Sequence, residues 1–264
     1  MWRKIPDWTI YLVIIIAIYA NANRASQKID TLPPPPELGP MLPNETPRDE
    51  RVVVNVERAG SGIGTAFAID NTGRWLTARH VVDSCDQIGI DIGGRQALRV
   101  ESYVSKDSDT AILTSNWKRK PLANDLYHDR QIGERGFFFG FPQGRPGEVV
   151  GSLLARNRMV IRGRYKSEET VLAWSEVGRT KGLVGSLGGL SGAPVMDKDG
   201  EVIGVVSAES PRRGRIYTVA PENLQDLIKD DDSHAEALSL RSYGLQADRL
   251  RRERRIAQVI CIVR

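Results

Sequence analysis

Cysteine is scarce in this chain, with only two residues among 264. Cys85 and Cys261 lie far apart, and neither stands in a metal-binding spacing. One thiol pair cannot build a closed zinc site. The sequence therefore predicts no metal site and no cofactor.

Two other features are missing, and each absence excludes a class of protein. The formal net charge is +4, but the arginines gather between Arg249 and Arg255 without an aromatic and basic platform, so we expect no nucleic-acid partner. Long helical patterns are also absent. The apolar runs are short, rich in β-branched and aromatic residues, and separated by turns, which favours an all-β fold. The chain is long enough to bury a full core.

Residues 1–22 have the features of an export segment. Arg3 and Lys4 precede an apolar stretch from Trp8 to Ala20, and small residues follow at the positions that signal peptidase reads. This stretch is shorter than the roughly 20 residues that comfortably span a bilayer. Its isoleucine-rich centre nevertheless keeps an uncleaved membrane anchor open as the alternative to a cleaved signal peptide.

The rest of the chain divides by composition. Residues 23–51 are polar and proline-rich, which is typical of an extended linker. Predicted strands then fall into two groups, 52–125 and 126–228, and the second group ends in a helix. Residues 229–264 form a basic tail with a predicted helix, which either contacts anionic lipid or a partner, or packs one face on the body.

A glycine-rich loop, GGLSGAP, surrounds Ser191. A serine between glycines and ahead of a proline can project its hydroxyl, while Gly189 keeps nearby backbone N–H groups unobstructed. An acyl-transfer nucleophile needs such donors, together with a base within reach. The same composition also forms ordinary turns. The Gly-x-Ser-x-Gly elbow of many esterases is absent, because Ala193 takes the last glycine position.

Two further candidates precede this loop. His80 stands at the exit of a predicted hairpin strand, within the segment TARHVV. Asp109 stands at the mouth of the apolar strand 110–113, where a carboxylate either caps a turn or holds the far nitrogen of an imidazole. With Ser191, these residues supply a base, an orienting acid and a nucleophile.

In these motifs the chain resembles the chymotrypsin-fold serine peptidases, and most of all their bacterial trypsin-like branch that includes the HtrA (Deg) proteases. The resemblance covers about residues 52–227 and implies two six-stranded antiparallel β-barrels. It rests on segments in the family's order, namely Gly64-Thr65-Ala66-Phe67, Thr77-Ala78-Arg79-His80-Val81-Val82, Asp109-Thr110-Ala111-Ile112-Leu113, Gly140-Phe141-Pro142-Gln143-Gly144 and Gly189-Leu190-Ser191-Gly192-Ala193-Pro194.

The resemblance also implies a role for each candidate. His80 becomes the general base and later the general acid, Asp109 orients it, and Ser191 is the nucleophile. The N–H groups of Gly189 and Ser191 form the oxyanion hole. The family places its aspartate directly before an x-Ala-apolar-apolar strand, which selects Asp109 over Asp107.

The substrate pocket is less well marked. Gly185 occupies the position of the residue at the pocket floor in the resembling family, and Ser207 lies on a strand that walls the pocket. A glycine there predicts a small or medium apolar side chain before the scissile bond. Leu190 and Ala193 differ from the usual residues of the family, and these differences motivate a catalytically inactive binding or scaffold protein as the alternative.

The sequence thus predicts a serine endopeptidase that acts on polypeptides through an acyl-enzyme, with protein quality control as one role to consider. We expect it to be exported, either to the periplasm or anchored in the inner membrane and facing the periplasm if the source is bacterial. Residues 229–264 are too few for the PDZ domain of the HtrA branch, so none is expected. Export would allow a Cys85–Cys261 disulfide, with two separate buried thiols as the alternative.

Overall fold

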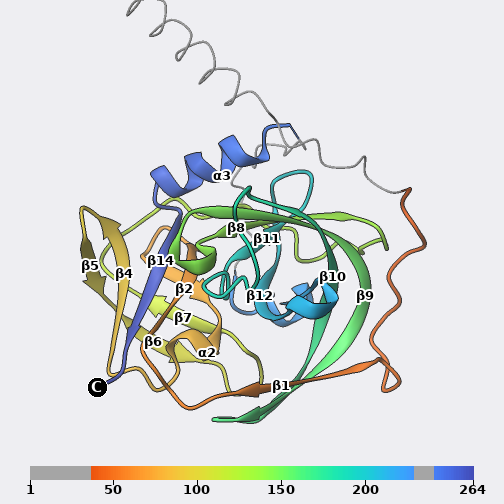
Figure 1. Cartoon of the computed structure of the whole chain (residues 1–264), viewed down its shortest axis with the longest axis horizontal. Coiled ribbons are helices and arrows are strands. Elements are labelled where there is room, and N and C mark those ends of the chain that lie inside the picture. The colour runs from red at the N-terminus through yellow and green to blue at the C-terminus, as the bar shows by residue number, and fades with distance from the viewer. Residues whose placement is uncertain (1–36, 229–240) are drawn as a thin grey trace, which may run out of the picture. The chain divides into compact units, whose positions relative to one another are not determined.

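The computed structural model describes residues 37–228 and 241–264 of the chain (Figure 1). The predicted export segment, 1–22, the four consecutive prolines of the linker and the start of the predicted tail lie outside the described residues. Within the described parts, no helix has both the length and the apolar character needed to cross a membrane.

Two seven-stranded sheets carry the fold. The strands of the first sheet are β2 (Gly62–Ala68), β3 (Arg74–Thr77), β4 (Gln87–Gly93), β5 (Gln96–Arg99), β6 (Glu101–Val104), β7 (Ala111–Thr114) and β14 (Ile256–Ile262). Those of the second are β1 (Arg51–Val56), β8 (Arg135–Gly140), β9 (Gly147–Gly163), β10 (Ser167–Arg179), β11 (Pro194–Met196), β12 (Val202–Ser210) and β13 (Arg215–Val219). The prediction of an all-β fold is confirmed.

The second sheet closes on itself. Its strand order is β1-β9-β10-β13-β12-β11-β8, and β8 also pairs with β9, so that β8 to β13 form a closed six-stranded barrel. The first sheet has the order β5-β4-β14-β2-β3-β7-β6. Each sheet therefore contains one strand more than the six predicted.

The two additional strands are formed by segments that we expected in other parts of the fold. β1, expected in the first group of strands, instead pairs in parallel with β9 of the second sheet. β14, expected within the basic tail, pairs with both β2 and β4 and becomes an inner strand of the first sheet. Alternate residues of β14 are buried there, namely Ala257, Val259 and Cys261. The apolar face of this strand explains why it enters the sheet.

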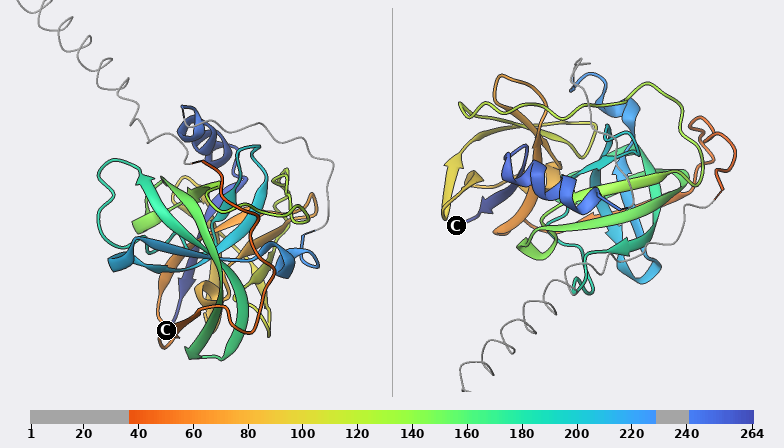
Figure 2. Two further views of the ribbon diagram at one scale, coloured as in Figure 1. Left: turned by 90° about the vertical axis from the view of Figure 1, so that its right-hand side faces the viewer. Right: turned by 90° about the horizontal axis from the view of Figure 1, so that it is seen from above.

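Within residues 37–228 and 241–264 the helices are short. They are α2 (Arg79–Val82), α3 (Tyr243–Arg252) and the 3-10 helices η1 (Pro142–Gly144), η2 (Pro211–Arg213) and η3 (Pro221–Leu224). The predicted terminal helix of the second barrel is thus only the single turn η3. The tail helix α3 contacts β14 and β8 and lies on the outside of the sheets (Figure 2). It buries Ala247 and Leu250 while Leu245 stays exposed, so it packs by one face.

Separate cores fill the two sheets. In the second, Phe138 meets Trp174 edge to face, with ring centroids 5.6 Å apart, and both rings are fully buried. The aromatic run of β8 is therefore core. In the first, Trp75 and Leu113 pack with Val259 from the C-terminal strand.

A disulfide bond joins Cys85 to Cys261, with Cα atoms 5.6 Å apart, and the chain has no free thiol. The bond fixes β14 to the segment that follows α2. It closes a loop with a sequence separation of 176 residues. In the chain-entropy model, a loop of this length contributes on the order of 4–5 kcal/mol to stability.

Candidate active site

Strand pairing brings His80 and Asp109 together. β3 and β7 are antiparallel partners with Thr77 opposite Ala111, so the residues just after β3 lie beside those just before β7. The backbone N–H of His80 donates to Asp109 Oδ1 over 3.0 Å, and His80 Nδ1 lies 2.8 Å from Asp109 Oδ2. The backbone N–H of Arg79 donates to the carbonyl oxygen of Asp109 over 3.1 Å. Two residues 29 positions apart in the chain thus form one rigid unit.

Asp109 is only 1% exposed, yet it remains a carboxylate. Besides His80, the hydroxyl of Tyr165 donates to Oδ1 over 2.6 Å, and the hydroxyl of Ser207 donates to Oδ2. Burial by itself raises the pKa of Asp109, but the charge of His80 and the hydrogen bonds from all three donor residues more than offset it. The pKa therefore lies below its usual value.

The protonation of His80 follows from this carboxylate. Burial lowers the pKa of His80, but the charge of Asp109 and its hydrogen bond outweigh that effect and raise the pKa above the ordinary 6.5. An ionised carboxylate can only accept hydrogen bonds, so Nδ1 carries the proton of the neutral ring. Nε2 is then left as a basic nitrogen, which is the arrangement that a general base requires.

Tyr165 is a site residue that sequence reasoning missed. It lies in the turn between β9 and β10 and is only 8% exposed. The guanidinium of Arg79 stacks over its ring, 3.8 Å from the centroid. The neighbouring Arg164 donates to the carbonyl oxygen of His80 over 2.6 Å and pairs with Asp83 over 3.2 Å. This turn of the second sheet therefore supports the imidazole and carboxylate of the first.

Ser207 contacts Asp109, a role that the sequence did not predict. Its side chain is buried and donates to Asp109, and its oxygen lies 3.8 Å from the sulfur of Met159. The hydroxyl of Ser207 is therefore bonded to the carboxylate of Asp109, and a substrate pocket walled by its strand stays a prediction.

The loop around Ser191 is fixed between the two sheets. The carbonyl oxygen of Ser191 accepts from the N–H of Thr65 in β2 over 2.8 Å, and the N–H of Gly192 donates to Val206 in β12 over 2.8 Å. Gly192 has φ +82°, and a Cβ atom there would lie 2.2 Å from the carbonyl oxygen of Thr65. Only glycine fits this position.

This loop lies next to the helix that carries His80. A Cβ atom added at Gly64 would lie 3.2 Å from the carbonyl oxygen of Ser191 and 2.5 Å from the side chain of Val81. The hydrogen bonds within the described parts of the chain do not include one between the Ser191 hydroxyl and the His80 ring. Catalytic hydrogen bonds are often long before substrate binds.

Backbone donors next to Ser191 are free. The carbonyl oxygen of Gly188 accepts from the N–H of Gln143 over 2.5 Å, which turns the N–H of the same peptide, on Gly189, to the opposite side. Thr65 Oγ1 in turn donates to the carbonyl oxygen of Gly189 over 2.8 Å. Among the hydrogen bonds of the described residues, none uses the N–H of Gly189 or of Ser191. Both groups can serve an incoming oxyanion.

The two departures from the family pattern are core positions. Leu190 is 1% exposed and Ala193 is fully buried, and both pack in the core of the second sheet. The N–H of Ala193 donates to the carbonyl oxygen of Leu190 over 2.9 Å. Their apolar side chains are therefore explained by packing and leave the donors of the loop unobstructed.

Gly185 lies on an exposed turn. Its φ is +77°, and a Cβ atom there would meet no atom within 4 Å. The two following residues are tied to Glu209 of β12, whose carboxylate accepts from the Ser186 hydroxyl and, over 2.9 Å, from the N–H of Leu187. The position predicted as the pocket floor is thus open to solvent, and Glu209 holds the adjoining segment.

One acidic group elsewhere resembles a metal site. Ligand atoms of Asp125, Asp197 and Glu201 lie within 4.8 Å of one another, the only such group among the residues that the structure describes. Arg130 forms ion pairs with both aspartates, at 3.3 Å for Asp197. Arg130 therefore offsets part of the negative charge of this cluster.

The geometry of fold and site agrees with the family comparison. Residues 64–205, more than half of the chain, match the model of the trypsin-like peptidase domain. The chain belongs to this family of peptidases.

Individual relatives share low sequence identity with this chain. A probable periplasmic serine endoprotease, DegP-like, from Pseudomonas savastanoi pv. phaseolicola is 26% identical over 219 residues, which is 80% of this chain and 41% of the relative. A protein described in the same words from Pseudomonas fulva is 28% identical over 167 residues, 60% of this chain and 31% of the relative. The chain therefore spans less than half the length of these curated relatives.

A solved structure shares the fold. The Rv3671c protease from M. tuberculosis in its active form has a TM-score of 0.52 with 14% identity, covering 75% of this chain and 95% of that one. At this identity the likeness shows the fold alone.

Proposed function

We propose that the chain is a serine endopeptidase in which His80, Asp109 and Ser191 form the catalytic triad. The observation that carries this proposal is the pair of half-buried His80 and buried Asp109, in which an ionised carboxylate holds Nδ1 and leaves Nε2 basic. The pair lies beside the loop of Ser191, and both lie within the segment that matches the peptidase family.

The proposed reaction uses each group in turn. His80 Nε2 accepts the proton of the Ser191 hydroxyl as the oxygen attacks the carbonyl carbon of a peptide bond. The N–H groups of Gly189 and Ser191 donate to the oxyanion of the tetrahedral intermediate. The charge of Asp109 stabilises the imidazolium, which then protonates the leaving amine. Water repeats the sequence on the acyl-enzyme and releases the acid.

The proposed setting is the periplasm, with exposed segments of polypeptides as substrates and protein quality control as the role. Two findings support the location. The curated relatives are named as periplasmic endoproteases, and the Cys85–Cys261 disulfide suits an oxidising compartment. Residues 1–22 would direct export, as a cleaved signal or as a retained anchor.

Labelling with a fluorophosphonate probe tests the assignment. The parent chain should be labelled, whereas Ser191→Ala and His80→Ala should not, because the probe reacts only with an activated serine. Ser115→Ala, at a serine bonded to Gly73 outside the site, serves as the matched control and should label like the parent. Labelling that persists in Ser191→Ala would place the nucleophile elsewhere. A folded parent chain that never reacts would instead support a binding or scaffold protein.

A further inference from the structure

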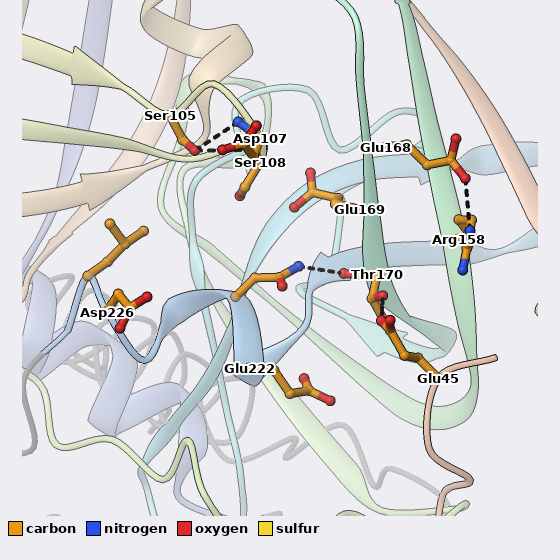
Figure 3. A pocket seen from close by; sticks show the side chains of 12 residues that line it. Glu45, Ser105, Asp107, Ser108, Arg158, Glu168, Glu169, Thr170, Glu222 and Asp226 are labelled. Atoms are coloured by element: carbon orange, nitrogen blue, oxygen red, sulfur yellow. Dashed lines mark hydrogen bonds and ion pairs between the residues drawn. The ribbon is translucent and has the colours of Figure 1, made fainter. Parts of the chain in front are cut away.

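A cavity of about 700 Å³ lies next to Asp109, outside the proposed catalytic groups (Figure 3). We call it the acidic cavity, because six of its lining side chains are carboxylates: Glu45, Asp107, Glu168, Glu169, Glu222 and Asp226. Its only lining cation is Arg158, which pairs with Glu168 over 3.2 Å.

Part of this negative charge has no partner. Glu168 pairs with arginines of β1 and β9, and Glu222 pairs with Arg156. Asp107 and Asp226, by contrast, form no ion pair among the described residues, and both are exposed at the rim. The acidic cavity therefore keeps a net negative charge.

Glu169 is the deepest of these carboxylates, at only 7% exposure. Its Oε1 accepts from the backbone N–H of Asp109 over 2.7 Å. Its Oε2 forms no hydrogen bond of ordinary length within the described parts of the chain, and the nearby hydroxyl of Ser108 is bonded to Thr110 Oγ1 over 3.1 Å. In Figure 3 the carboxylate projects from β10 into the cavity, toward the segment with Ser105 and Ser108. A buried oxygen without a donor costs free energy that a bound donor would recover.

The pKa of Glu169 also favours a bound cation. Burial, together with the charge of Asp109, raises the pKa of Glu169 to about 8. Hydrogen bonds from the N–H of Asp109 and from Ser108 act in the opposite direction. The other carboxylates that line the cavity are Glu45, Asp107 before β7, Glu168 on β10, Glu222 in η3 and Asp226 after it. A cation placed at Oε2 would replace the proton and stabilise the ionised form.

The spacing of the carboxylates decides which cation fits. The described residues hold only one group of three metal-ligating side chains within 4.8 Å, and that group lies elsewhere. The carboxylates of the acidic cavity are thus too dispersed to chelate a metal ion. An extended organic cation with several N–H donors can reach a deep carboxylate and rim charges together, and the guanidinium of arginine has this form.

We propose that the acidic cavity binds an arginine side chain from a basic segment of a polypeptide. Its guanidinium donates to Glu169 Oε2, while Asp107 and Asp226 attract neighbouring basic residues of the same segment.

Binding of a labelled hexa-arginine peptide tests this proposal. The full chain carries Ser191→Ala, so that the peptide is not cleaved and the outcome does not depend on the proposed peptidase activity. Fluorescence anisotropy is measured at about pH 8.5, above the pKa of Glu169, with hexa-citrulline as the uncharged ligand of matched shape. We expect saturable binding of the arginine peptide and at least about tenfold weaker binding of the citrulline peptide.

Variants locate the site. Glu169→Gln, which keeps an acceptor for the N–H of Asp109, should weaken binding about tenfold or more. Asp107→Asn with Asp226→Asn should weaken it several-fold. Glu57→Gln, at an exposed carboxylate outside the cavity, should bind like the parent. Thermal unfolding checks that each variant is folded. If Glu169→Gln does not fold, binding by the variant with both Asp107→Asn and Asp226→Asn decides whether the peptide occupies the acidic cavity.

Three results would overturn the proposal. They are equal affinity for the citrulline peptide, parent-like affinity in both the Glu169 and the rim variants, and no saturable binding at all. Calcium is titrated separately by calorimetry. If calcium binds and Glu169→Gln abolishes its binding while arginine peptides do not bind, the cavity is a metal site and the proposal is wrong.

Discussion

Protonation of His80 determines the pH range in which the proposed triad can work. The charge of Asp109 outweighs burial and raises the pKa of His80 above 6.5. Because only the neutral ring can accept a proton, kcat/KM should rise with pH and level off above this pKa. A series of kcat/KM values for a fluorogenic peptide between about pH 5 and pH 9 measures the midpoint. A midpoint below 6.5, or a flat profile, contradicts this assignment.

Tyr165 supports the same pair from the other sheet. Tyr165→Phe removes the donor at 2.6 Å from Asp109 Oδ1. With one donor fewer, the carboxylate directs more of its charge at the imidazolium, so the pH midpoint should move upward. The carboxylate is also held less firmly, and if this loss of positioning costs about 1.4 kcal/mol in the transition state, kcat falls tenfold with KM unchanged. Tyr217→Phe is the control, since Tyr217 is buried in the same cluster. Identical pH midpoints in the parent and Tyr165→Phe would exclude a positioning role for Tyr165.

The ionisation of Glu169 makes the stability of the fold depend on pH. Its carboxyl titrates near 4.5 in an unfolded chain and near 8 in the fold. Between these values the folded chain keeps a proton that the unfolded chain has released, so the free energy of unfolding falls as pH rises. Glu169→Gln removes this loss. It should therefore be more stable than the parent above about pH 8, by up to about 1.4 kcal/mol for each pKa unit of the shift.

Chemical denaturation at about pH 5 and pH 9 checks this expectation. The stability difference between Glu169→Gln and the parent should widen at the higher pH. Glu57→Gln should follow the parent at both values. A constant difference between Glu169→Gln and the parent would show that Glu169 ionises normally in the fold.

At the scale of elements, C-terminal β14 depends on the disulfide. Replacing Cys85 and Cys261 together with serine removes the bond that fixes this inner strand next to α2. Because the loop is long, the free energy of unfolding should fall by a few kcal/mol, with about 4–5 kcal/mol as the chain-entropy value. Denaturation with and without reductant measures it. The parent should lose stability on reduction and the double variant should not; a parent insensitive to a reductant that breaks the bond contradicts this.

Elements could be predicted from sequence where their signal is local. The hairpin from β2 to β3, the aromatic strand β8 and the helix in the tail each have a periodicity or turn of their own, and all are present. The partners of β1 and β14 could not be predicted, because pairing between distant segments depends on tertiary packing. The apolar run of β14 was visible, but nothing local shows that it enters between β2 and β4.

The residues of the candidate site also divide into those with a recognisable local motif and those placed only by tertiary packing. His80 and Asp109 stand in recognisable motifs, and the register of β3 with β7 brings them together. Tyr165 and Glu169 belong to the hairpin of β9 and β10 and carry no motif. They reach Asp109 only because of how that long hairpin lies against the first sheet. Their contributions could not be found without the structure.

At the scale of the whole molecule, both sheets contribute to one site. The first supplies His80 and Asp109, and the second supplies Tyr165, Ser207 and the loop of Ser191, which is tied back to β2. Ser191 and His80 therefore keep their relative positions only while the two sheets stay packed together, which the proposed triad requires. A site divided in this way should lose its activity as soon as the fold opens.

Acylation of Ser191, with His80 as its base, is the defining step of the proposed reaction. Rapid mixing of the full chain with an activated ester such as p-nitrophenyl acetate measures this directly, through the initial burst of released nitrophenol. We expect a burst of one equivalent per chain and, after acid quenching, an acyl group mapped by mass spectrometry to Ser191, both lost in His80→Ala. An absent burst in the folded chain, or an acyl group on another residue, would contradict it.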